Sequence, residues 1–312
     1  MSSIKGFYSY SKNHGIKKAF QEVLRRILGI EKHDEAIKTL YYYLNHIVDI
    51  TQVPPTKNVG LRNVQIGDSL LLGIFDKICR SNGITYWIDF GTLLGYVRHK
   101  GFIPWDDDMD VSMPRDDYNR FISLTHQEFE SYGIDIIEYP GCYGIGYKHK
   151  QTGLWLDVFP KDKYGITRTY DDEIDNLKTK INKYKKKFGI PKDIIDPKVL
   201  AKRREKIIGV ENTSHNILYM SLEFFLPRCV CHDENWIFPL NRGFFEGIEV
   251  NIPNDVDTVL SQIYGKQYMS FPQSGIEHHD QGRGPLGSWA EKSGTNMQDI
   301  IKALKDIYSS IE

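Results

Sequence analysis

Cysteine is scarce in this sequence of 312 residues. Its four cysteines, Cys79, Cys142, Cys229 and Cys231, are too few and too scattered for a disulfide framework. Cys229, Cys231 and the adjoining His232 have the spacing of half a zinc site, but the sequence shows no second pair of ligands. We therefore expect ordinary thiols here, with a bound metal as the alternative.

The sequence also lacks the features of exported and membrane-spanning chains. It contains no run of 18 apolar residues and no apolar region of a signal peptide. These absences predict a cytoplasmic protein. The net charge is −1, so there is no excess of positive charge and we expect no nucleic-acid partner.

The hydrophobic content of 40% is enough for a large core, in one large domain or in a domain with an insertion. The patterns predict an α+β fold whose mixed sheet is flanked by helices. We expect a helical segment over residues 1–60, a catalytic core over 61–160, a helical insertion over 161–227 and the rest of the core over 228–312. Two lysine- and arginine-rich stretches, 178–187 and 202–206, make the insertion partly basic, either as a solvated face or as a grip for an anionic ligand.

Residues 15–30 have the pattern of an amphipathic helix, with apolar residues on one face and Lys18 and Arg25 opposite. Such a helix can dock on its own domain, which is the more common case. It can also lie on an anionic membrane, which would give the protein a peripheral contact at the inner face of the membrane.

The stretch with the clearest chemistry is WIDFGTLLGYVRHKGFIPWDDDMDVSMPRDD, residues 87–117. Pro104 favours an extended chain, so residues 105–113 are expected to form a strand in which Asp106, Asp108 and Asp110 share one face. Three neighbouring carboxylates repel one another unless a cation lies between them. The pattern therefore predicts a Mg²⁺ or Mn²⁺ site, since hard cations prefer oxygen ligands.

A turn at Phe90, Gly91 and Thr92 follows the apolar strand 84–88 and opens a short helix. Backbone N–H groups at a helix N-terminus attract phosphate, so Gly91 and Thr92 are candidate phosphate contacts. Farther on, Asp157 lies in the expected strand 154–159, the last of three antiparallel strands. An unpaired acid between apolar residues costs several kcal/mol, about 2–7 for an ordinary polar group, so the metal is its expected companion.

The run GTLLGYVRHKGFIPWDDDMDVSMPRDDY resembles the LicD family of phosphocholine transferases, whose distant relatives include fukutin and the fukutin-related protein. GLWLDVFP, residues 153–160, is similar to the second motif of this family. FEGIEV at 245–250 and IYG at 263–265 are similar to its C-terminal signature. The resemblance covers roughly residues 64–271 and is weakest over 161–238.

The resemblance implies a nucleotidyltransferase-like fold and metal-dependent transfer of a phospho-alcohol. Asp108 and Asp110 would be the primary metal ligands, Asp106 a further ligand or outer partner, and Asp157 the third carboxylate of the pattern, which can also act as the base. The donor would be CDP-choline or another CDP-alcohol, such as CDP-ribitol or CDP-glycerol. The acceptor would be a hydroxyl of a cell-surface glycan or of its lipid-linked precursor.

Arg98, Lys100 and Arg242 are the cations expected near the phosphates, although arginine and lysine at turns are commonly just exposed. Two other functions stay open. A nucleotidyltransferase would use the same acids on a nucleoside triphosphate and leave the nucleotide on its product. A glycan-binding module without catalysis would not need the acids at all.

Overall fold

The computed structural model describes residues 30–139, 142–189, 195–209, 215–222, 230–271 and 293–311. The chain divides into two compact units, residues 1–52 with 270–273 and residues 53–269 with 274–312. The amphipathic helix expected over residues 15–30 lies outside the described residues except for Ile30, and so does Cys229.

The first unit contains the helix α3 (Ile30–Ile47) and a short 3₁₀ helix, η1 (Ile50–Gln52). Within it, the N–H of Phe271 donates to Asn45 Oδ1 at 2.7 Å. Several apolar side chains of α3 are exposed, among them Leu40 and Ile47. Among the described residues, no helix has the length and apolar content needed to cross a bilayer.

The second unit is built on a mixed sheet, in which seven strands fall within the described residues. Its path runs β1, β2, β5, β4, β3, and β6 pairs with both β5 and β7. Only β2 and β5 are parallel among these pairs; the others are antiparallel. The strands are β1 (Trp87–Ile88), β2 (Asp110–Pro114), β3 (Asp135–Tyr139), β4 (Cys142–Gly146), β5 (Trp155–Ile166), β6 (His215–Met220) and β7 (Cys231–Asp233).

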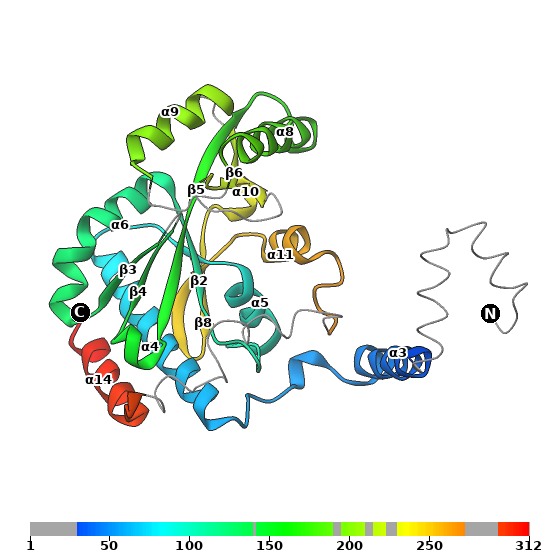
Figure 1. The fold of residues 1–312 in the computed structure, drawn as a ribbon, viewed down its shortest axis with the longest axis vertical. Coiled ribbons are helices and arrows are strands. Elements are labelled where there is room, and N and C mark those ends of the chain that lie inside the picture. The colour runs from blue at the N-terminus through cyan, green and yellow to red at the C-terminus, as the bar shows by residue number, and fades with distance from the viewer. Residues whose placement is uncertain are drawn as a thin grey trace, which may run out of the picture. The chain divides into compact units, whose positions relative to one another are not determined.

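Helices pack against several strands of this sheet, among them β2, β5 and β6 (Figure 1). Near α4 the chain also forms a two-stranded hairpin, β8 (Asn241–Phe245) and β9 (Ile248–Ile252). The helices are α4 (Val59–Ser81), α5 (Phe90–His99), α6 (Arg115–Glu128), η2 (Glu130–Tyr132), α7 (His149–Thr152), α8 (Tyr170–Phe188), α9 (Pro197–Ile207), α10 (Glu234–Ile237), α11 (Val256–Tyr264) and α14 (Met297–Ser310).

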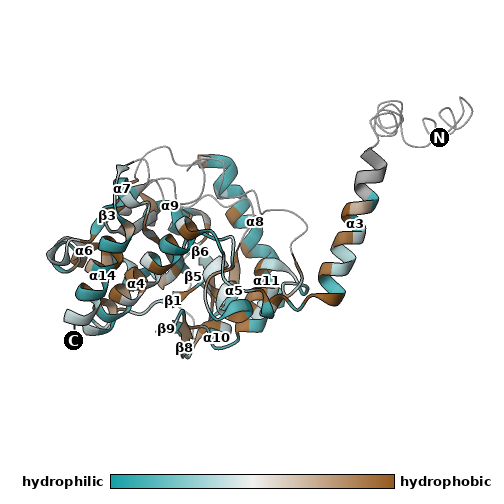
Figure 2. Ribbon diagram, turned by 90° about the horizontal axis from the view of Figure 1, so that it is seen from below, coloured by the Kyte–Doolittle hydropathy of each residue, from teal (hydrophilic) through white to brown (hydrophobic). Residues whose placement is uncertain are grey.

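Local signals fix several helix ends. Asn58 caps α4, because its side chain accepts the N–H of Leu61. Thr169 and Asp172 form a reciprocal capping box at the start of α8. The apolar side of α8 is buried, and the rest of this helix is strongly hydrophilic (Figure 2).

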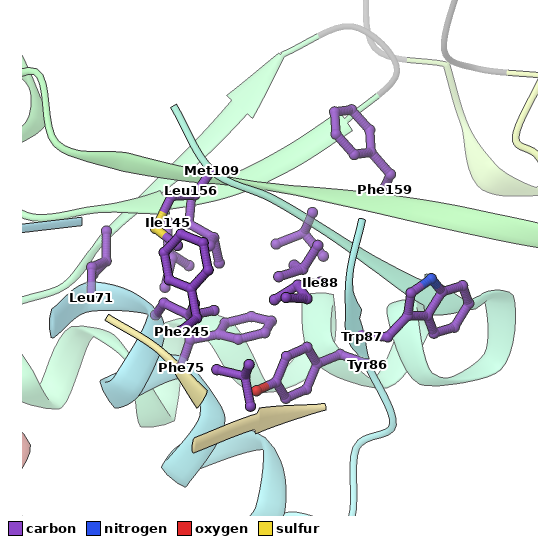
Figure 3. Close-up of a cluster of buried hydrophobic side chains, with 14 of the residues drawn as sticks. Leu71, Phe75, Tyr86, Trp87, Ile88, Met109, Ile145, Leu156, Phe159 and Phe245 are labelled. Atoms are coloured by element: carbon purple, nitrogen blue, oxygen red, sulfur yellow. The ribbon is translucent and has the colours of Figure 1, made fainter. Parts of the chain in front are cut away.

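The core lies between α4 and one face of the sheet. Leu71 and Phe75 of α4 point toward Ile145 and Leu156, and all four are fully buried (Figure 3). Phe159 stands on the other side of its strand from Leu156, as the alternation of side chains along a strand requires (Figure 3). The odd-numbered residues of β5 around it therefore belong to the opposite face, which carries the functional side chains.

The expected mixed sheet flanked by helices is confirmed, and so is the antiparallel run of β3, β4 and β5. The expected strand over residues 105–113 is wrong in its first half, because β2 begins only at Asp110. The N–H of Asp106 bonds to Ile103 O at 2.9 Å, which turns the chain before the strand. The boundary expected at residue 160 falls inside β5, and β6 returns to the same sheet.

Candidate functional site

The turn into α5 is strained at one residue. Asp89 is the N-cap, and its Oδ1 accepts the N–H of Phe90 at 2.9 Å. Phe90 has φ +46°, a left-handed conformation that a bulky residue adopts rarely. Such strain persists only where the surroundings hold it, and it is common at functional sites. Here the Phe90 ring packs edge-on against Phe159, with centroids 5.6 Å apart.

This turn is bonded directly to the start of β2. The N–H of Asp110 donates to Thr92 Oγ1 at 2.8 Å, and the N–H of Asp89 donates to Asp110 O at 3.0 Å. A Cβ on Gly91 would lie 3.1 Å from Asp106 Oδ2 and 3.9 Å from Asp110 Oδ2. The glycine therefore allows two carboxylates to approach the backbone of the turn, which places the expected phosphate contacts beside the acids.

Asp157 reaches the same place from β5. It lies directly opposite Asp110 in the parallel pair, so both side chains are on one face of the sheet. Burial raises the pKa of Asp110 well above its usual value, and the charges of Asp108, Asp157, Asp106 and Asp89 raise it further. The structure thus brings together Asp106, Asp108, Asp110 and Asp157, with the first two contributed by the loop before β2 rather than by the strand.

The donor set suits a hard divalent cation, because it consists of carboxylate oxygens whose mutual repulsion a cation relieves. Within the described part of the chain, no group of three or more histidine, cysteine or acidic side chains is arranged as a ready-made metal centre. The acids are close enough to raise the pKa of Asp110, but their oxygens are not arranged as a complete set of metal ligands. Binding of an ion would have to draw their oxygens together.

Distant segments hold the loop that carries Asp106 and Asp108. Glu246, in the turn between β8 and β9, accepts the N–H of Phe102 at 3.2 Å and pairs with Arg62 of α4 at 2.6 Å. The side-chain amide of Gln65 donates to Asp106 O at 2.9 Å. Glu246 of the FEGIEV motif therefore supports the start of the acid loop through Phe102 and Arg62.

A buried ion pair beside the acids was not anticipated from the sequence. Lys161 Nζ lies 2.9 Å from Asp89 Oδ2, and neither side chain is exposed. Ser112 Oγ donates to the same oxygen at 2.7 Å. Burial alone would raise the pKa of Asp89, but Lys161 and these bonds hold it below its usual value. An aspartate directly before a helix, as at Asp89, is a recognisable N-cap signal. Lys161 gives no such signal, because it follows a proline at the expected end of its strand.

His232 completes this buried group. Burial and, to a smaller extent, the charge of Lys161 lower its pKa to about 4, against the opposing charge of Asp89. Its neighbour Cys231 faces the other side of β7, where it packs in the cluster around α8. The two side chains point to opposite faces and so do not converge on one ion.

The three cations expected near the phosphates have other contacts. Arg98 is buried and donates to the backbone oxygen of Tyr268. Lys100 ends α5 in a left-handed conformation, with Nζ 4.9 Å from the centre of the Tyr96 ring. Arg242 pairs with Asp76 at 2.8 Å. The first two lie at the C-terminal end of α5, about 12 Å along the helix from the turn that faces the acids.

Comparison with known proteins identifies related sequences. The family model described as "LicD/FKTN/FKRP, nucleotidyltransferase domain" matches residues 83–210. The lipopolysaccharide cholinephosphotransferase LicD of Haemophilus influenzae is 45% identical over 265 residues, which cover 72% of this chain and 98% of that protein. The chain belongs to the LicD family. An uncharacterised protein of Rickettsia prowazekii is 34% identical over 123 residues, 36% of this LicD-family chain and 43% of that relative.

Proposed function

We propose that this LicD-family enzyme transfers phosphocholine from CDP-choline to a hydroxyl of a cell-surface glycan or its lipid-linked precursor, and releases CMP. The convergence of Asp106, Asp108, Asp110 and Asp157 beside the Gly91 turn carries this proposal. The name of the Haemophilus relative supports phosphocholine as the group transferred and lipopolysaccharide as the acceptor class.

In this reaction Asp108 and Asp110 would be the primary ligands of Mg²⁺ or Mn²⁺, with Asp106 and Asp157 completing the set. The ion, when bound, would neutralise negative charge on the donor diphosphate. The backbone N–H of Gly91 and the hydroxyl proton of Thr92, whose oxygen already accepts from Asp110, would be the donors to the phosphates. These groups position the diphosphate against the sheet.

Asp157 would take the proton of the acceptor hydroxyl. The acceptor oxygen then attacks the phosphorus of the phosphocholine group, a new P–O bond forms, and the bond to CMP breaks. CMP leaves with the electron pair of that bond. The protein contributes mainly positioning and charge neutralisation, as is usual for phosphoryl transfer.

The principal alternative is nucleotidyl transfer, which the fold would also permit. The two reactions differ in which side of the diphosphate moves, so the product separates them. Incubation with CDP-choline, Mg²⁺ and lipopolysaccharide that lacks phosphocholine should release CMP and add one phosphodiester-linked choline per modified site, seen by mass spectrometry. A nucleotide on the acceptor, with pyrophosphate released from a nucleoside triphosphate, would instead identify the enzyme as a nucleotidyltransferase.

Choline itself is the part of the donor supported least by the chain. Trp87, which lies three residues before the Phe90 turn, is fully buried against Phe238 and belongs to the core, so it offers no face to a choline group. CDP-glycerol and CDP-ribitol are therefore included as parallel donors in the same assay. Transfer from one of them alone would keep the mechanism and change the substrate.

A further inference from the structure

A cavity of about 750 Å³ opens at the edge of the sheet beyond the site. Its walls come from the edge strand β3, the turn before it and the short helix α7. Ile137 of β3 and His149 of α7 are among its lining residues. The mechanism above leaves this cavity unused.

The cavity lies along the edge strand, so its β3 residues belong to both faces of the sheet, and the register puts Asp135 and Ile137 on the face of the acids. Asp157 of β5 lies opposite Gly144 of β4, and Gly144 lies opposite Ile137 of β3. Residues opposite each other in paired strands share a face, so Ile137 and Asp157 are on the same side of the sheet. Two strand spacings separate them, about 10 Å. This is the span of one or two sugar rings, and the residue between them on that face is a glycine without a side chain.

An aromatic pair lies along the same path. Trp155 precedes Asp157 by two residues, so its half-buried ring is on the face of the acids. The ring of His149, which lines the cavity, lies 4.9 Å from that of Trp155 at 45°. A Cβ on Gly146 would come within 2.9 Å of Ile137 Cδ1 and 3.0 Å of His149 Cβ. Glycine at this position is therefore what lets α7 close onto the sheet next to the tryptophan.

The chemistry of the cavity favours a carbohydrate over the choline group. Its rim carries both donors, such as Lys150 and Gln151, and acceptors, such as Asp135 and Glu138. Mixed donors and acceptors beside an amphipathic aromatic ring match the hydroxyls and apolar face of a sugar. A trimethylammonium group has no N–H or O–H donor and no acceptor, so it could form no hydrogen bond with these donors and acceptors of the rim.

We propose that the cavity, with Trp155 and His149, is the acceptor subsite, where sugar rings of the glycan bind and present a hydroxyl to Asp157. This assignment rests on the proposed transfer reaction. It separates the two substrates in space, because the donor diphosphate would lie at the Gly91 turn and the acceptor would approach over β4 and β3.

The test uses the full-length protein and phosphocholine-free lipopolysaccharide oligosaccharide from Haemophilus, with CDP-choline as donor. Trp155→Leu and His149→Ala should each raise the KM for the oligosaccharide at least tenfold, while the KM for CDP-choline stays within twofold. Lys150→Glu, at an exposed position, should act in the same direction and covers the case in which substitution of the half-buried Trp155 or His149 disturbs folding. Lys302→Glu, an equally exposed lysine on α14, is the matched control and should change neither KM.

A rise in the KM for CDP-choline alone would assign the aromatic pair to the donor and overturn the proposal, as would an unchanged oligosaccharide KM in all three variants. Binding of the oligosaccharide without donor, followed by saturation-transfer NMR, distinguishes this inference from the transfer reaction. Wild-type binding that Lys150→Glu and His149→Ala weaken would support the subsite even if CDP-choline proved inert. Binding unaffected by them, or no binding to wild type, would refute it.

Discussion

Lys161 and Asp89 form an ion pair of 2.9 Å with both side chains fully buried. The pair joins β5 to the cap of α5, so it connects the strand of Asp157 to the turn of Gly91. The charge of Lys161 also faces the Phe90 ring, 4.8 Å from its centre. Because Asp89 adds negative charge near Asp110, the lysine partly balances the cluster of acids.

Breaking this pair should be costly on either side. Lys161→Met or Asp89→Asn should each lower the free energy of unfolding by roughly 3–5 kcal/mol, since a buried charge is left without its partner. The double variant should lose clearly less than the sum. Chemical denaturation measures all four proteins, with Lys163→Met as the control. Lys163 is half exposed in its pair with Glu234, so its loss should cost under about 1 kcal/mol; additive effects at Lys161 and Asp89 would argue against coupling.

The lowered pKa of His232 predicts that the protein loses stability in mild acid. Its folded pKa of about 4 lies below the usual 6.5, so as the pH falls from 6.5 the unfolded chain takes up a proton that the folded chain does not. The free energy of unfolding should fall by an amount on the order of 3 kcal/mol by pH 4 from this group. His232→Gln should remove that part of the slope. Identical slopes in the two proteins between pH 6.5 and 4 would contradict the assignment.

A side chain at Gly91 should impair the site. The Cβ of Gly91→Ala would lie 3.1 Å from Asp106 Oδ2, which must move away from the turn. We expect kcat/KM to fall on the order of tenfold, equivalent to about 1.4 kcal/mol. Thr92→Ser keeps the oxygen that accepts the Asp110 N–H and should retain activity. Equal kinetics for Gly91→Ala and wild type would remove the turn from the site.

Glu246 should affect stability and activity because it holds the loop that carries Asp106 and Asp108. Glu246→Gln weakens both the pair with Arg62 and the bond from Phe102, at a cost of about 1–3 kcal/mol in stability. Hydrogen exchange at the Phe102 amide should speed up, and activity should fall with it. Glu249→Gln changes an exposed acid on the same hairpin and is the control. Unchanged exchange at Phe102 would show that the loop does not depend on Glu246.

Much of this site could be predicted because its signals are local. The carboxylates of residues 106–110 and the turn at Gly91 are each readable within a few residues. The strand assigned to residues 105–113 was wrong because the turn at Asp106 depends on Gln65 and Glu246, which are remote in sequence. The acids nevertheless meet, since the loop and the strand converge on the same turn.

The cations show the limit of sequence reasoning most clearly. The residues around Arg242 do not show whether it contacts a phosphate or pairs with an acid. Its partner Asp76 lies on α4, far away in the sequence, so only the folded structure reveals the pair. Lys161 could not be assigned from its neighbours, since its partner Asp89 lies on another element and the strand continues past the proline. Pairings between distant segments decide the roles of such side chains.

Direct measurement of metal binding tests the central claim that the four acids form one site on which transfer depends. Titration of the metal-free protein with Mn²⁺, followed by electron paramagnetic resonance, should show binding that Asp108→Asn and Asp110→Asn abolish together with transfer. Asp110→Asn should also raise the melting temperature of the metal-free protein, because it removes a carboxyl group whose charged form is disfavoured by burial and by the neighbouring acids. Asp116→Asn, an acid at the start of α6, should bind and react like wild type. Turnover of CDP-choline in excess chelator, or unchanged Mn²⁺ binding in both variants, would contradict the account.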